Sequence, residues 1–138
     1  MKDNSIDLLV LGPGTHLRWL LGFSPPQDER PSMLLIGKER EIFLIPSVNA
    51  EDVRRKTDIK INVWKDESGP DQALKEALLY IDESSAKHIA IDEAMRAHFA
   101  LIAIDALPNP THEFTGSTIG ALRMRKDQTE FINLKENA

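Results

Sequence analysis

The sequence predicts an α/β domain built on a mixed β-sheet of about five or six strands, with helices flanking the sheet. Short apolar segments typical of strands alternate with segments whose apolar residues recur every three or four positions, as in helices. Two of the strand-like segments are separated by the four residues 37–40, which predicts an antiparallel hairpin within the sheet. No internal repeat or low-complexity segment interrupts this order.

The expected strands are short and rich in apolar residues. Residues 6–11 (IDLLVL) form a nearly continuous apolar run before the turn residues 12–14 (GPG), which is typical of a buried strand. Residues 59–64 instead alternate apolar and polar side chains, as a half-exposed strand does. The other expected strands are residues 33–36 and 41–46, which form the hairpin, and residues 88–91 and 112–115.

Helices are expected between these strands. Thr15 is placed to cap a short helix that Gly22 ends. Asn49 and Asp52 resemble a capping arrangement that would open a second helix. The other expected helices are residues 70–81, which begin at a proline and carry an apolar stripe, residues 94–107, residues 117–124, and a terminal helix that Asp127 would cap.

Composition excludes several classes of protein. The 138 residues fit one domain, and the net charge of −5 argues against a nucleic-acid partner. The chain has no cysteine, so disulfides, thiolate metal sites and cysteine nucleophiles are excluded. No apolar run approaches the ~20 residues needed to cross a bilayer, so no membrane partner is expected. Residues 1–14 lack the layout of a signal peptide, and we therefore expect a cytoplasmic protein.

No combination of residues predicts a catalytic site. The turn residues 12–14 lack the further glycine and the lysine of nucleotide-binding loops, which favours a structural turn. The adjacent carboxylates Asp92 and Glu93 would face opposite sides of a strand, which favours capping of the next helix over acid–base chemistry. The histidines lie in different elements without metal-binding spacing, so no metal site is expected: His16, His88, His98 and His112.

Arg30 is the one binding candidate that the residues themselves suggest. It lies near the end of a proline-rich polar loop, residues 24–31, just before an expected buried strand. A guanidinium group pairs with carboxylates through two parallel hydrogen bonds, so Arg30 could bind an anion. The alternative is a surface ion pair with Asp28 or Glu29.

Three segments in a fixed order resemble motifs of a known family. They are LRWLLGF at residues 17–23, IAIDEAMRA at residues 89–97 and LRMRKDQTE at residues 122–130. Together they resemble the N-terminal domain of the creatinase/prolidase/aminopeptidase P family of pita-bread metallopeptidases, most like a bacterial Xaa-Pro dipeptidase. The similarity runs over essentially the whole chain. It implies a ribonuclease H-like α/β fold.

The resemblance also implies how the chain is organised. Residues 1–125 would be the N-terminal domain, and residues 126–138 would begin the linker helix that leads to a catalytic domain. That missing domain would bind two divalent metal ions, Mn, Co or Zn, whereas this chain would carry no cofactor and no catalytic residue. The alternative is a stand-alone binding or scaffolding module of the same fold.

In that family the N-terminal domain shapes the substrate pocket and the interface of a homodimer. The resemblance therefore implies proline-containing short peptides as substrates of the parent enzyme, and the chain's own C-terminal catalytic domain as its partner. Arg30 is similar in position to the family's substrate-facing arginine. Trp19 would line the same mouth, or would instead pack in the core beside Leu17 and Leu20.

Overall fold

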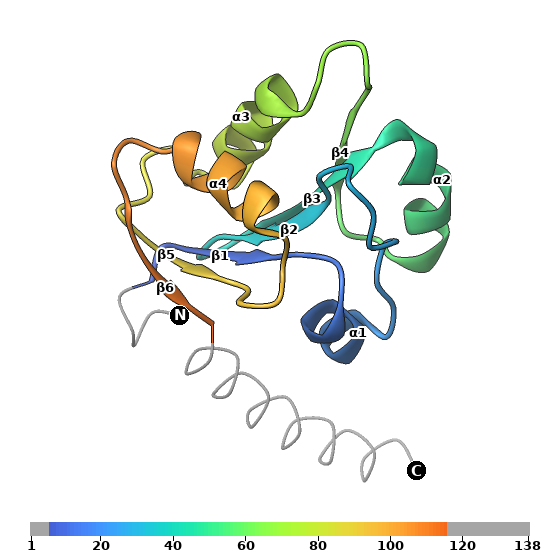
Figure 1. The fold of residues 1–138 in the computed structure, drawn as a ribbon, viewed down its shortest axis with the longest axis horizontal. Coiled ribbons are helices and arrows are strands. Elements are labelled where there is room, and N and C mark those ends of the chain that lie inside the picture. The colour runs from blue at the N-terminus through green and yellow to red at the C-terminus, as the bar shows by residue number, and fades with distance from the viewer. Residues whose placement is uncertain (1–5, 116–138) are drawn as a thin grey trace, which may run out of the picture.

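The computed structural model describes residues 6–115, which form a six-stranded mixed sheet with helices on both faces (Figure 1). The strands lie in the order β4-β3-β2-β1-β5-β6. The predicted α/β class and mixed sheet are confirmed. In chain order the elements are β1 (Leu8–Leu11), α1 (Thr15–Leu21), β2 (Met33–Ile36), β3 (Glu41–Pro46), α2 (Ser47–Lys56), β4 (Ile61–Trp64), α3 (Asp71–Tyr80), β5 (His88–Ile91), α4 (Ala97–Asp105) and β6 (Thr111–Phe114).

All the strands of this sheet except β2 run in the same direction. β2 is antiparallel to both β1 and β3, and the pairs β3–β4, β1–β5 and β5–β6 are parallel. The carboxyl ends of β1, β3, β4, β5 and β6 therefore lie along one edge of the sheet, next to the start of β2. We call this the carboxyl edge.

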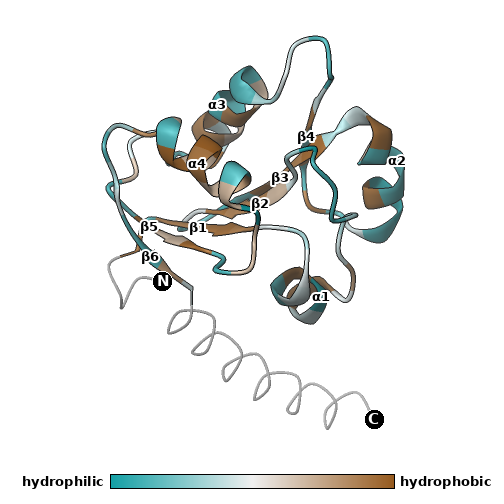
Figure 2. Ribbon diagram, in the orientation of Figure 1, coloured by the Kyte–Doolittle hydropathy of each residue, from teal (hydrophilic) through white to brown (hydrophobic). Residues whose placement is uncertain are grey.

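Both faces of the central strands are buried, whereas every residue of the edge strand β6 is exposed. α3 and α4 cover one face, where they pack against Leu8 and Val10 of β1, and α1 and α2 cover the other, where they pack against Leu9 and Leu11. Successive residues of a strand point to opposite faces, so one apolar run supplies both clusters. Figure 2 shows the hydrophobic strands at the centre and polar residues on the outer surfaces of the helices.

Most predicted elements are confirmed within a few residues, including the hairpin of β2 and β3 and the buried apolar stripe of α3. The helix caps predicted at Thr15 and at Asn49 are wrong. Thr15 is the first residue of α1, and no side chain caps that helix. α2 begins at Ser47, directly after the extended Pro46, so Asn49 and Asp52 lie inside it. The expected helix at residues 117–124 and the Asp127 cap lie outside the described residues.

Gly22 ends α1 as predicted. It adopts a left-handed conformation, with φ 83° and ψ −1°, and its N–H donates to the carbonyl oxygen of Arg18. Gly14, which precedes the helix, has φ 144°, a conformation that residues with a Cβ rarely adopt. The short helix α1 is therefore bounded by two glycines that the backbone geometry requires.

Asp7 joins three segments at the opposite edge of the sheet. Its Oδ2 accepts hydrogen bonds from the N–H groups of Lys87 (2.9 Å) and His88 (3.2 Å), at the start of β5. Its Oδ1 lies 2.9 Å from Nζ of Lys38, in the β2–β3 loop. The hydrogen bond from Lys38 and the bonds from the backbone hold the pKa of Asp7 below its usual value.

We expect Asp7→Ala to lower the free energy of unfolding by about 1–3 kcal/mol at pH 7, because two backbone donors lose their acceptor. Since the folded-state pKa of Asp7 is lowered, its carboxylate stabilises the protein above the unfolded pKa of about 4, and this contribution is lost as pH falls through the folded pKa. Urea unfolding of both proteins between pH 7 and 2 should show the difference shrinking in acid.

The matched control is Asp58→Ala, which removes an exposed carboxylate from the loop before β4. It should change the unfolding free energy by no more than about 0.5 kcal/mol at any pH. A stability difference for Asp7→Ala that stays constant down to pH 2 would contradict the assigned role of the Asp7 carboxylate.

Candidate functional site

The loops after β1 and β5 leave the carboxyl edge in opposite directions. The loop after β1 leads to α1 on one face, and the loop after β5 leads to α4 on the other (Figure 1). β1 and β5 are adjacent parallel strands, so the two loops diverge from neighbouring positions. In open α/β sheets such a switch point forms a crevice outside the strand ends, where ligands bind.

The buried carboxylate of Asp92 connects these two loops. Oδ2 accepts a hydrogen bond from the N–H of Gly12 (3.2 Å), after β1, and Oδ1 accepts one from the N–H of Ala94 (2.8 Å). Burial raises the pKa of Asp92, although these backbone bonds oppose the change. The prediction that Asp92 caps the next helix is wrong, because Asp92 closes a turn and α4 begins only at Ala97.

A small polar network lies beside Asp92. Nε2 of His16 lies 3.1 Å from Oε1 of Glu93 and 3.7 Å from Oδ1 of Asp92. Thr115, directly after β6, donates a hydrogen bond of 2.7 Å from its hydroxyl to Oε2 of Glu93. His16, which lies far in the sequence from any partner with metal-binding spacing, is therefore brought beside two carboxylates by the fold. Neighbouring parallel strands end together, so the positions of His16, Asp92 and Thr115 after three strands were the signal that could have revealed this network.

The network also contains the groups that most resemble metal ligands. His16, Asp92 and Glu93 each offer one possible ligand atom, and these three atoms lie within 4.8 Å of one another. Imidazole and carboxylate groups suit zinc and manganese. However, hydrogen bonds from Gly12, Ala94 and Thr115 already engage the carboxylate oxygens. Such bonds stabilise a buried carboxylate without an ion, and we therefore assign the network a structural role, joining the ends of β1, β5 and β6.

The other histidines do not join this network. His88 begins β5 at the opposite edge, where Nδ1 lies 2.7 Å from the hydroxyl oxygen of Thr111 and Nε2 lies 3.7 Å from Glu113. His98 on α4 and His112 on β6 are exposed. Within residues 6–115, His16 is the histidine that the fold brings to the carboxyl edge.

Gly12 allows the β5–α4 loop to cross closely over the end of β1. A Cβ atom added at Gly12 would lie 2.5 Å from Cβ of Met95 and 3.4 Å from Cα of Met95. Atoms that close overlap severely, and the Met95 atoms belong to or adjoin the backbone. The turn predicted at residues 12–14 is therefore confirmed, and its first glycine is required by contact with a distant segment.

Arg30 lies at the carboxyl edge, as its place before β2 predicts. Its Nε and Nη2 donate hydrogen bonds of 3.2 Å each to the two carboxylate oxygens of Asp66, after β4. This pairing raises the pKa of Arg30. The ion-pair partner is thus Asp66, and Asp28 instead accepts a 2.9 Å hydrogen bond from the backbone N–H of Arg30. A cavity of about 290 Å³ adjoins the pair, lined by Glu29, Arg30, Pro31, Trp64 and Asp66.

Trp19 is half-buried on α1. It is therefore neither a fully buried core residue, like its neighbour Leu17, nor a fully exposed side chain. Its helix covers the sheet face opposite α4. Whether Trp19 contacts a substrate stays a prediction.

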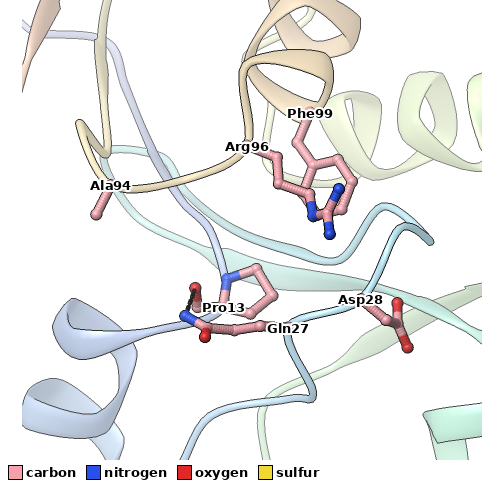
Figure 3. A pocket seen from close by; sticks show the side chains of 6 residues that line it. All are labelled: Pro13, Gln27, Asp28, Ala94, Arg96 and Phe99. Carbon is pink, nitrogen blue, oxygen red and sulfur yellow. Dashed lines mark hydrogen bonds between the residues drawn. The ribbon is translucent and has the colours of Figure 1, made fainter.

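A larger cavity of about 370 Å³ lies at the switch point itself (Figure 3). We call it the switch-point crevice. Its walls come from the loop after β1, the proline-rich loop before β2, the loop after β5, and the first turn of α4. The lining residues are Pro13, Gln27, Asp28, Ala94, Arg96 and Phe99.

The sequence of this chain matches the model of one protein family. Residues 1–125 match the family described as the creatinase/prolidase N-terminal domain, so the chain belongs to this family. No curated protein sequence matches the chain. None of the helices within residues 6–115 combines the length and the apolar character that a bilayer crossing requires.

Solved structures show the same fold. A dipeptidase from Pyrococcus horikoshii OT3 is 27% identical, with a TM-score of 0.78, and the match covers 89% of this chain and 34% of that one. The creatinase/prolidase N-terminal domain of an X-Pro dipeptidase from Streptococcus pyogenes is 12% identical, with a TM-score of 0.75, and the match covers 87% and 90%. The N-terminal domain of an Xaa-Pro dipeptidase from Lactobacillus brevis is 14% identical, with a TM-score of 0.75, and the match covers 87% of this chain and 92% of that one. This chain thus spans about a third of the Pyrococcus dipeptidase.

We expect Gly12→Ala to lower the free energy of unfolding by about 1–3 kcal/mol, because the new methyl group overlaps Met95. A double-mutant cycle tests the cause. Met95→Ala keeps the Cβ and should leave the cost of Gly12→Ala unchanged, whereas Met95→Gly removes the Cβ and should relieve most of it. Urea unfolding measures the loss of unfolding free energy caused by Gly12→Ala in each background. Equal losses in Met95→Ala and Met95→Gly would contradict the assigned overlap with the Met95 Cβ.

We expect Thr115→Val to raise the pKa of Glu93. Burial alone would raise this pKa, but the hydrogen bonds from Thr115 and His16 outweigh burial and hold the pKa below its usual value. Valine has nearly the shape of threonine but cannot donate to Oε2. NMR titration of the Glu93 carboxyl group measures the change. Thr111→Val, at the other end of β6, is the control and should leave the pKa of Glu93 unaltered.

Proposed function

We propose that this chain acts as the non-catalytic N-terminal domain of an Xaa-Pro dipeptidase-type metallopeptidase. The observation that carries the proposal is the family match over residues 1–125, together with the likeness to N-terminal domains of Xaa-Pro dipeptidases. The domain would shape the substrate pocket and the interface of a cytoplasmic homodimer. Peptide hydrolysis would belong to a catalytic domain that follows a linker starting near residue 126 and holds a pair of divalent metal ions.

The carboxyl edge is the part of the domain suited to face a substrate. It carries Arg30, the cavity beside it and the switch-point crevice, whereas the opposite edge carries the structural contacts of Asp7. In the proposed enzyme, Arg30 contacts the carboxylate of a proline-containing short peptide, and Trp19 lines the mouth of the same pocket. The alternative, a stand-alone binding module, has no comparable support, because three of the neighbouring structures are longer dipeptidase or prolidase chains, of which this fold covers about a third.

The ion pair with Asp66 is compatible with substrate binding by Arg30. Both side chains are substantially exposed, at 41% for Arg30 and 60% for Asp66. An exposed pair of this kind contributes only about 0–1 kcal/mol, so a substrate carboxylate can displace Asp66 at little cost. In the free domain, the Asp66 carboxylate accepts hydrogen bonds from two nitrogens of the Arg30 guanidinium and so holds that group in place.

In an enzyme that joins this domain to its catalytic domain, we expect Arg30→Ala to raise the KM for Xaa-Pro dipeptides about tenfold or more, with little change in kcat. The reason is the loss of a charge-assisted hydrogen bond to the bound substrate. Asp66→Asn should lower KM or leave it unchanged, because it removes the competing carboxylate. Steady-state kinetics measure both.

Arg54→Ala is the matched control, because Arg54 also pairs with an exposed carboxylate, Glu51, but lies on α2. It should leave KM unaltered. An unchanged KM in Arg30→Ala would remove Arg30 from the substrate site. Reading the gene beyond residue 138 tests the wider proposal, because a frame encoding the metal ligands supports it and an immediate stop supports the stand-alone module.

A further inference from the structure

The switch-point crevice presents one positive and one negative side chain from separate loops. Arg96 comes from the loop after β5, and its guanidinium extends into the space above Pro13 (Figure 3). Asp28 comes from the proline-rich loop on the other side. No ion pair joins Arg96 to Asp28, and the Arg96 side chain has no hydrogen-bond or ion-pair partner within residues 6–115.

Arg96 and Arg30 differ in whether their guanidinium groups are paired. The guanidinium of Arg30 already donates to both oxygens of Asp66, whereas the fork of Arg96 is open to a ligand. A guanidinium binds a carboxylate through two parallel hydrogen bonds, which gives it both affinity and orientation. Arg96 is therefore the arginine of the carboxyl edge that can bind a carboxylate without displacing another group of the described chain.

Asp28 is held in place but keeps one oxygen available. Its Oδ1 accepts the backbone N–H of Arg30 at 2.9 Å, which fixes the carboxylate at the rim of the crevice. Its Oδ2 has no such bond within the described residues and can accept from an ammonium group.

The remaining walls suit a small organic ligand. Pro13 and Phe99 are buried apolar residues, and Gln27 is fixed because its Nε2 donates to the carbonyl oxygen of Pro13 at 3.0 Å. A volume of about 370 Å³ lies at the small end of the range for ligand pockets, and its position is that at which open α/β sheets bind ligands.

We propose that the switch-point crevice binds a small zwitterion with an apolar side chain, namely a free α-amino acid or a dipeptide, with Arg96 holding the carboxylate and Asp28 holding the ammonium group. The crevice is open to solvent, so the affinity is modest, with a Kd on the order of 1 mM. This proposal rests on the geometry of the crevice and is independent of the proposed function.

The test is an NMR titration of the 138-residue chain with glycyl-L-proline as the probe. Shifts should appear at the amide groups that border the crevice, those of Gly12, Gly14 and Ala94, with a Kd on the order of 1 mM. Two analogues each lack one charge: N-acetyl-glycyl-L-proline has no ammonium group, and glycyl-L-prolinamide has no carboxylate. Each should bind about tenfold more weakly.

Two variants assign the contacts. Arg96→Gln should weaken binding of glycyl-L-proline about tenfold but leave the weak binding of the amide analogue unchanged. Asp28→Asn keeps an oxygen that accepts from the Arg30 N–H, so the loop is preserved. It should weaken binding of the dipeptide but not binding of its acetylated analogue. Arg55→Gln, an exposed arginine on α2, is the control and should change nothing.

Three outcomes overturn the proposal. One is the absence of shifts at the crevice up to about 50 mM dipeptide, fifty times the expected Kd. Another is unchanged affinity in Arg96→Gln, with a spectrum that shows the variant is folded. The third is equal binding of the acetylated and free dipeptides, which would define a simple anion site. None of them bears on Arg30 or on the family match, so failure here leaves the proposed function standing.

Discussion

The buried carboxylate of Asp92 holds the carboxyl edge together. It accepts hydrogen bonds from Gly12, after β1, and from Ala94, after β5, although burial opposes its charge. Such a group is costly to bury unless its oxygens are bonded, so the two loops are fixed to it and to each other. The close approach of Met95 to Gly12 follows from this arrangement. Pro13 and Ala94, which adjoin these contacts, form two walls of the switch-point crevice.

The direction of the strands explains why binding features gather at one edge. With β2 the only reversed strand of the described sheet, five strands end at the same edge and their following loops converge there. The Arg30–Asp66 pair joins the loop before β2 to the end of β4, and the His16 network joins β1, β5 and β6. A domain proposed to serve a catalytic partner thus has one structured edge on which recognition can occur, supported by apolar clusters on both faces.

The elements were predictable where side-chain periodicity was clear. The hairpin of β2 and β3, the buried run of β1 and the stripe of α3 follow from local patterns, because a side chain's position in a strand or helix sets which face it occupies. Periodicity does not show how a helix begins, and the side-chain caps predicted at Thr15 and Asn49 are not present. β3 passes directly into α2 at Pro46, and a proline-fixed backbone begins that helix without a side-chain cap.

The site was less predictable than the fold. The sequence placed Arg30 in a loop before a buried strand, and that position is correct, but its partner Asp66 is 36 residues away. His16 and Glu93 are 77 residues apart, and Gly12 and Asp92 are 80 apart. Local periodicity carries no information about such pairs, because they depend on which strands lie side by side.

The sequence by itself determined the class of fold, the order of its elements, the glycine turns and, through its ordered motifs, the family. Only the tertiary structure decided which loops meet at the carboxyl edge, which arginine is paired and which is open, and that Asp92 joins two loops instead of capping a helix. The physical reason is that the fold class, the order of elements and the turns depend on interactions between residues close in sequence. The contacts between loops at the carboxyl edge depend instead on the lateral order and direction of the strands.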